Sequence, residues 1–123
     1  MKATAKAHPN IALVKYWGKR DEKLILPHQS SLSVTLGPLA VVITVEFTGA
    51  RGPDEIEING RVAEGTERKR VEDALKLVRA EAKGARLGAA KMVSHGDFPA
   101  AAGLASSAAA FAALAVAARA AAG

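Results

Sequence analysis

An uncharged stretch over residues 98–118 is the feature that most constrains how this chain can fold. It opens with Pro99 and small residues around Gly103, continues through two serines, and ends in a run of alanines that reaches Ala122. Alanine has the highest helix propensity, whereas proline and glycine interrupt helices, so the pattern predicts a loop followed by a helix over residues 108–122. A membrane span is excluded because alanine is weakly apolar and loop-forming residues fill the first half.

The start of the predicted helix is a candidate anion site. The first amide groups of a helix lack partners within it and lie at the positive end of its dipole. Small residues and serine hydroxyls beside these amides leave room for an anion, and phosphate is the first candidate. No Gly-Lys-Ser/Thr follows, so the lysine-centred phosphate loop is excluded. The alternative is a core helix capped by serine, in which alanine and glycine only permit close packing.

Length and composition fit one domain with a real core, because half of the 123 residues are apolar. The chain has no cysteine, which excludes disulfides and thiolate chemistry. His8, His28 and His95 lack the spacing of metal ligands, so we expect no metal bound by protein side chains. No apolar run follows the N-terminal lysine, so we expect no signal peptide and a cytoplasmic location.

The net charge of +5 is concentrated at the N-terminus. Residues 1–23 hold six lysines or arginines against Asp21 and Glu22, whereas the remaining residues are nearly balanced. A local positive field favours an anionic ligand. Nucleic-acid binding usually needs a longer basic stripe, and the RNA-binding signatures are absent. We therefore expect a small anionic ligand, and neither nucleic acid nor membrane as a partner.

The rest of the pattern predicts a sheet with helices on one face, an α+β fold. We expect paired strands or a β-hairpin around His8-Pro9, and further strands at residues 24–26, 31–36, 40–47 and 87–94. Residues 55–62 predict a hairpin with a type I′ turn at Asn59-Gly60. A helix is expected over residues 67–83, capped by Thr66, ended by Gly84, and apolar along one face.

A second motif occupies residues 8–21. On a strand, Ile11, Leu13 and Lys15 share one face, so the lysine would follow two core residues at the end of the strand. An ammonium there needs a partner, because an unpaired buried charge is costly. Gly18 then frees the chain and lets Lys19 reach an anion. The alternative is an amphipathic strand end whose lysines extend into solvent.

Three segments together resemble the diphosphomevalonate decarboxylase family of the GHMP kinase superfamily. They are residues 10–21 (NIALVKYWGKRD), 24–36 (LILPHQSSLSVTL) and 97–109 (DFPAAAGLASSAA). The resemblance spans nearly the whole chain and implies a fold similar to the second domain of ribosomal protein S5. It identifies residues 1–123 as the N-terminal ATP- and substrate-binding part of a GHMP-type domain whose C-terminal region is absent here.

The resemblance also implies roles. Family members use ATP and Mg²⁺ to phosphorylate the tertiary hydroxyl of diphosphomevalonate, which then loses phosphate and CO₂ to give isopentenyl diphosphate. Lys15 matches a catalytic lysine near the reacting centre. The residues that match the substrate-binding segment are Tyr16, Trp17, Gly18 and Lys19, joined by Arg68. Those that match the ATP phosphate loop are Ala101, Ala102, Gly103, Leu104, Ala105, Ser106 and Ser107. A homodimer is implied for the full-length enzyme.

Two features differ from the family pattern. Gln29 stands where an asparagine is usual, and the region that holds the catalytic aspartate is missing. Asp21, Asp54 and Asp97 lie in positions that do not suit a general base. Three alternatives follow: a mevalonate 3-kinase or a phosphomevalonate decarboxylase on the same fold, or a non-catalytic S5-like domain that binds RNA or a protein partner.

Overall fold

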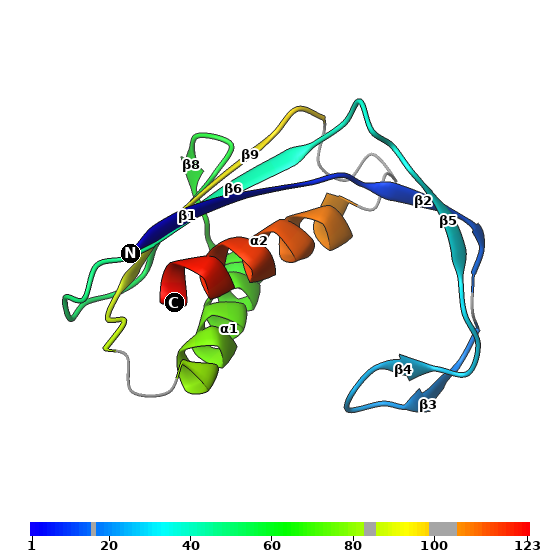
Figure 1. Cartoon of the computed structure of the whole chain (residues 1–123), viewed down its shortest axis with the longest axis horizontal. Coiled ribbons are helices and arrows are strands. Elements are labelled where there is room, and N and C mark those ends of the chain that lie inside the picture. The colour runs from blue at the N-terminus through cyan, green and yellow to red at the C-terminus, as the bar shows by residue number, and fades with distance from the viewer. Residues whose placement is uncertain (16, 83–85, 99–105) are drawn as a thin grey trace.

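The structure is a computed structural model that describes residues 1–15, 17–82, 86–98 and 106–123. Within these residues a five-stranded sheet and two helices form the body, and two small strand pairs extend from it as an arm (Figure 1). The body consists of β1 (Lys2–Ala7), β6 (Val41–Phe47), β7 (Glu55–Ile58), β8 (Arg61–Val62), α1 (Gly65–Glu81), β9 (Ala90–Gly96) and α2 (Ser106–Ala122). The arm consists of β2 (Asn10–Val14), β3 (Lys19–Asp21), β4 (Leu26–Pro27) and β5 (Leu32–Thr35).

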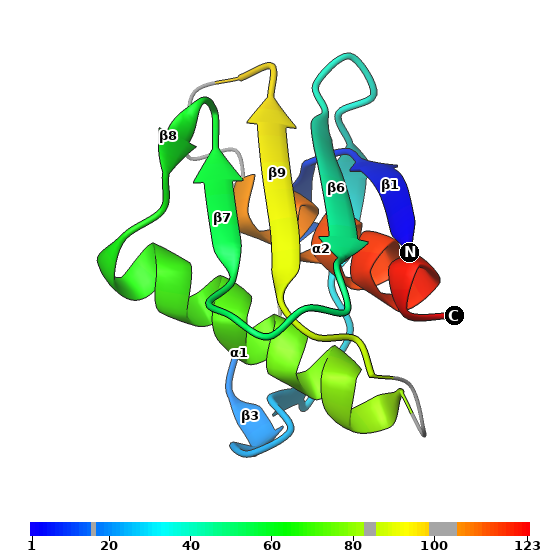
Figure 2. The same cartoon turned by 90° about the vertical axis from the view of Figure 1, so that its left-hand side faces the viewer.

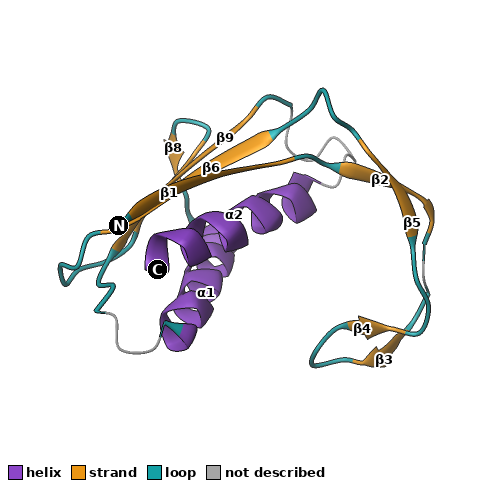
Figure 3. Ribbon diagram, viewed as in Figure 1, coloured by secondary structure: helices purple, strands orange, loops and turns teal. Residues whose placement is uncertain are grey.

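The sheet of the body has the strand order β1-β6-β9-β7-β8 (Figure 2). Its neighbours run antiparallel except β7 and β9, which are parallel. Both helices lie on the same side of this sheet (Figure 3). The predicted α+β fold with helices on one face is therefore confirmed.

The core lies between that face and the helices. Along β6 the residues Val41, Ile43, Val45 and Phe47 are buried, while the residues between them are more exposed. This is the period of two that strands impose on side chains. Leu75 of α1 and Leu114 of α2 complete the core, and the buried alanines of α2 let its backbone approach the sheet closely.

An ion pair fastens the end of α1 to the sheet. Arg79 donates to both carboxylate oxygens of Asp54, at 3.1 and 2.6 Å, and to the carbonyl of Gly88 at 3.1 Å. The Asp54 carboxylate also accepts the amide of Ala90 at 2.8 Å, and the Arg79 guanidinium lies over the Phe47 ring. Asp54 thus joins the β6–β7 loop, α1 and the start of β9.

The predicted pairing around His8-Pro9 is wrong. β1 pairs with β6 in the main sheet, whereas β2 pairs with β5 in the arm. Proline has no amide hydrogen to continue a ladder, and the carbonyl of Pro9 accepts the amide of Leu36 at 2.8 Å. The buried Pro9 is therefore the point where the chain leaves one sheet for the other.

The arm also differs from expectation in burial. Residues 31–36 alternate as a half-buried strand should, yet all four residues of β5 are exposed. The strand expected at residues 24–26 is found at Leu26–Pro27, paired with β3, which the sequence did not predict. Leu13 is 66% exposed, so Lys15 does not follow two core residues in this chain.

The hairpin at Asn59-Gly60 is confirmed, with φ angles of 50° and 77° that fit a type I′ turn. The α1 helix begins at Gly65 with Glu64 as its N-cap, so Thr66 lies inside the helix and does not cap it. Gly84, the expected helix end, lies outside the described residues. The β9 strand and the α2 helix differ from their predicted bounds by only two or three residues, the usual uncertainty of element ends.

Candidate functional site

The arm leaves the body at the end of the sheet where α2 begins (Figure 1). There the His8 ring nitrogen Nδ1 lies 2.7 Å from the carbonyl of Leu39, which ties the β1–β2 connection to the segment that enters β6. The β9 strand ends at Gly96 on the same side, since its partner in β6 is Val41. Two hollows lie beside this junction, one in the body and one in the arm.

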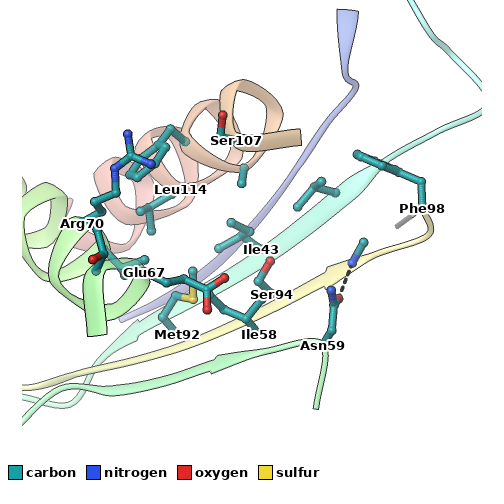
Figure 4. Close-up of a pocket in the computed structure, with 16 residues that line it drawn as sticks. Ile43, Ile58, Asn59, Glu67, Arg70, Met92, Ser94, Phe98, Ser107 and Leu114 are labelled. Atoms are coloured by element: carbon teal, nitrogen blue, oxygen red, sulfur yellow. Dashed lines mark hydrogen bonds between the residues drawn. The ribbon is translucent and has the colours of Figure 1, made fainter. Parts of the chain in front are cut away.

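The hollow in the body is a pocket of about 340 Å³ between the sheet and the two helices (Figure 4). Ile43 and Met92 form its floor on the sheet, and Val71 and Leu114 are its helical walls. Phe98 and Phe111 line it as well. An apolar pocket of this size suits a flat ring or a similar apolar group.

Polar side chains stand around the pocket. Glu67 pairs with Arg61 at 2.8 Å, and the Arg70 guanidinium lies 5.8 Å from the centre of the Phe111 ring. Asn59 lies on the tip of the β7–β8 hairpin, and Ser107 is the second residue of α2. The pocket therefore combines apolar walls with a helix N-terminus, where an anion is stabilised.

The hollow in the arm lies against the paired strands β2 and β5. Asn10, Ala12, Lys15, Ser31 and Ser33 line it, and Asn10 donates to the Ser33 hydroxyl at 3.1 Å. Among the described residues no carboxylate lines it, so Lys15 gives it a positive field. Hydroxyls, an amide and an ammonium together are suited to an anionic, oxygen-rich ligand.

The structure places the residues predicted to act on the substrate at different positions along the arm and the body. Lys15 lines the arm hollow, and Gly18 has a φ of +79°, the left-handed conformation that lets the chain turn. Trp17 is 86% exposed. Lys19 lies on β3, where its ammonium pairs with Glu22 at 3.1 Å. Tyr16 lies outside the described residues.

Arg68 lies on α1, where both of its polar partners belong to the body. Its guanidinium pairs with Glu72 at 2.8 Å and donates to the carbonyl of Asp54 at 2.8 Å. Arg70, two residues later, lines the body pocket instead. The structure therefore does not bring Arg68 together with the hollow that contains Lys15.

The phosphate-loop prediction falls mostly outside the described residues, which exclude Ala101, Ala102, Gly103, Leu104 and Ala105. Ser106 and Ser107 are the first two residues of α2, so the serines stand at a helix N-terminus as expected. Ser107 also lines the body pocket.

The three aspartates judged unsuitable as bases each hold backbone in place. Asp21 accepts the amide of Leu24 at 2.7 Å. Asp54 belongs to the Arg79 ion pair, and Asp97 accepts the amide of Ala40 at 2.7 Å. Their hydrogen bonds give each a structural role.

The body pocket itself was not predicted from the sequence. The Asn59-Gly60 turn and Phe98 were both visible in the motifs, yet nothing in the sequence indicated that they would face one cavity. Glu67 and Arg70 are two of many charged residues on α1. Only the packing of α1 against α2 shows which of these charged residues line the pocket.

Within residues 1–15, 17–82, 86–98 and 106–123, no three acidic or histidine side chains come together as a metal site. The helices in that part of the chain are too short or too polar to cross a membrane.

Residues 7–123 match the model of the diphosphomevalonate decarboxylase-like N-terminal domain. Because this match covers nearly the whole chain, the chain belongs to that family. Its structural neighbours are mevalonate diphosphate decarboxylases of the GHMP kinase type. The predicted family and fold are therefore confirmed.

Particular relatives include the diphosphomevalonate decarboxylase of Ganoderma lucidum, 44% identical over 91% of this chain and 31% of its own length. The phosphomevalonate decarboxylase of Haloferax volcanii is 39% identical over 95% of this chain and 36% of its own length. The chain thus spans about a third of the curated relatives it matches.

Solved structures agree. The mevalonate diphosphate decarboxylase of Enterococcus faecalis, described for its ATP-binding mechanism, superposes with a TM-score of 0.87 at 43% identity. The match covers 99% of this chain and 37% of that one. A structure of MDDEF in complex with MVAPP, AMPPCP and magnesium superposes at 0.86, with 43% identity and the same coverage of both chains.

Proposed function

We propose that this chain is the N-terminal part of an ATP-dependent diphosphomevalonate decarboxylase, with nucleotide bound in the body and substrate bound in the arm. The single observation that carries the proposal is the pair of hollows at the junction. One is apolar and ends at a helix N-terminus, and the other contains Lys15 among hydroxyl and amide groups. The complex of a relative with MVAPP, AMPPCP and magnesium supports the same two ligand classes.

The body pocket fits an adenine nucleotide. Its apolar walls would hold the base, and the phosphates would lie toward the start of α2, where Ser107 stands. The small residues Ala101, Ala102, Gly103 and Ala105 would let phosphate oxygens approach the backbone. ATP, when bound there, supplies the phosphoryl group that activates the substrate hydroxyl.

Magnesium would be held mainly by the nucleotide. Mg²⁺ keeps several waters and is usually bound through phosphates and one or two protein oxygens. The Ser106 and Ser107 hydroxyls are the candidates in this part of the chain. This arrangement requires no cluster of carboxylates around the pocket.

The arm would bind the phosphorylated mevalonate. Lys15 would lie near the reacting centre and stabilise negative charge that develops in the transition state. The binding role for the diphosphate falls to Tyr16, Trp17, Gly18 and Lys19. The Lys19–Glu22 pair is exposed, so it is weak enough for a phosphate to replace the carboxylate. Arg68 could join them only by exchanging its present partners.

The remaining part of the full-length protein would supply the general base and cover the arm. Asp21 and Asp97, the aspartates of the two motifs, hold backbone amides, which leaves proton removal from the hydroxyl to another segment. Leu13, Trp17 and Leu32 are at least 60% exposed, and a further region of about twice this length could bury them. A homodimer and a cytoplasmic location are part of this proposal.

A phosphomevalonate decarboxylase is the second candidate. The Haloferax enzyme of that name is nearly as similar to this chain as the diphosphate-specific relatives are. Comparison of kcat/KM for the mono- and diphosphate substrates in the full-length protein separates the two. A higher value for the monophosphate would transfer the proposal to this second enzyme.

Release of CO₂ directly tests whether residues 1–123 need the remaining part of the full-length protein for catalysis. Residues 1–123 alone, with diphosphomevalonate and Mg-ATP, are expected to release none above the uncatalysed rate. The full-length protein is expected to release CO₂ and phosphate in equal amounts. Turnover by residues 1–123 alone would mean that Asp21 or Asp97 serves as the base.

A further inference from the structure

The end of β9 is held by side chains on both sides. On the β7 side, the Asn59 Oδ1 accepts a hydrogen bond from the backbone amide of Gly96 at 2.8 Å, and the backbone amide of Asn59 donates to the carbonyl of Ser94 at 2.8 Å. Figure 4 shows the first of these bonds as a dashed line at the rim of the pocket. The side chain therefore continues the β7–β9 ladder beyond the last paired residues.

On the β6 side, Asp97 forms a reciprocal pair with Ala40. The Asp97 amide donates to the Ala40 carbonyl at 3.1 Å, and the Asp97 carboxylate accepts the Ala40 amide at 2.7 Å. Ala40 is buried, so this carboxylate satisfies an amide that water reaches poorly. Two consecutive residues, Gly96 and Asp97, are thus fixed from opposite sides.

The position of these two residues gives the bonds a consequence for ligand binding. Asn59, Gly96 and Phe98 all line the body pocket, and the chain next enters the segment that connects to Ser107. A pocket that orients a nucleotide needs a fixed rim, since misplaced contacts lose most of their contribution. Asn59 is suited to this task because it tolerates the left-handed φ of 50° that the turn requires.

We propose that Asn59 and Asp97 are positioning residues that fix residues 96–98 at the rim of the body pocket and thereby set the affinity for nucleotide. This inference rests on the proposed function and adds to it two residues outside the predicted contacts. It also explains why a carboxylate stands beside an anion site, although a free carboxylate there would repel phosphate: Asp97 has a structural role. The amide of Ala40 occupies that carboxylate.

Four variants of the full-length protein test the inference by initial-rate kinetics. Asn59→Gly keeps the left-handed turn but removes the acceptor, and Asp97→Ala removes the other. Each is expected to raise KM for Mg-ATP about fivefold, the effect of one lost hydrogen bond, and to leave KM for the phosphorylated substrate within about twofold. Asp97→Asn keeps an acceptor oxygen and is expected to restore KM for ATP.

His95→Ala is the matched control, because His95 precedes Gly96 on the same strand and is exposed on the opposite face. It is expected to change neither KM. If the wild type is active but Asn59→Gly and Asp97→Ala leave KM for ATP unchanged, this inference alone is overturned. The same holds if the two variants raise KM for ATP and KM for the phosphorylated substrate equally. A wild type that does not use ATP would overturn the proposed function and this inference with it.

Discussion

β6 and β5 both have an apolar residue at every second position, but their surroundings are opposite. Val45 in β6 is fully buried, because α2 covers that face of the body sheet. Val34 in β5 is 50% exposed, because within the described residues nothing covers the arm. An alternating pattern thus identifies a strand with one apolar face, and a covering element elsewhere decides whether that face is buried.

The body and the arm therefore differ in how much of their apolar surface the described residues bury. The body combines a continuous core with the Asp54–Arg79 ion pair. The arm has two short strand pairs and exposed apolar side chains, and isolated pairs of this kind are marginal in water. Stability is therefore expected to depend on the body, whereas recognition of the substrate depends on the arm.

The largest expected effect is on the free energy of unfolding, and it is tested by substituting one buried and one exposed leucine. Leu75→Ala leaves a cavity in the body, where Leu75 is fully buried, and is expected to cost about 2–5 kcal/mol of unfolding free energy. Leu32→Ala in the arm, where Leu32 is 60% exposed, is expected to cost less than about 0.5 kcal/mol. Denaturant unfolding of residues 1–123 followed by circular dichroism measures both. Equal losses would mean that the arm is part of the same cooperative core.

The next effect concerns catalysis from the arm. Lys15→Met in the full-length protein is expected to lower kcat about 100-fold with a smaller change in KM, because the lost charge acts mainly on the transition state. Lys6→Met, on an exposed position of β1 in the body, is the control and is expected to leave kcat unchanged. A Lys15→Met protein with wild-type kcat would reduce Lys15 to an exposed residue at a strand end.

The smallest effect concerns Thr66, which the sequence marked as a helix cap. It lies inside α1 and its side chain makes no capping bond, so Thr66→Ala is expected to change stability by less than about 0.5 kcal/mol. A true cap would cost about 1 kcal/mol on removal. Thermal or denaturant unfolding of residues 1–123 decides between these values.

The parts of the fold that follow from local chemistry were predictable. The Asn59-Gly60 turn, the buried strand at residues 40–47 and the alanine-rich helix each depend on residues within a few positions of one another. The partner of β2 was not predictable, because Pro9 ends one ladder and the residues that pair with β2 lie 18 to 25 positions further along the chain. The prediction that Leu13 is a core residue was wrong because the alternating pattern of β2 does not say whether another element covers its apolar face, and Leu13 is 66% exposed.

The candidate site shows the same limit. The helix N-terminus at Ser106 and Ser107 follows from alanine propensity and the loop before it, and Lys15 stands out by its motif. The pocket between α1 and α2 depends on tertiary packing that brings Arg70 to Phe111. The apolar periodicity of each helix does not indicate that these two residues, more than 40 positions apart, come into contact.

The separation of ligands between the body and the arm is tested most directly by one pair of variants in the full-length protein. Initial rates are measured at varied ATP and varied substrate for Ser107→Ala and Lys19→Ala. Ser107→Ala is expected to raise KM for ATP about fivefold and to spare the substrate, because it removes one hydroxyl at the start of α2. Lys19→Ala is expected to raise KM for the substrate at least about tenfold and to spare ATP, because it removes a charge-assisted contact. If both variants raise both KM values alike, the two regions do not divide the ligands between them.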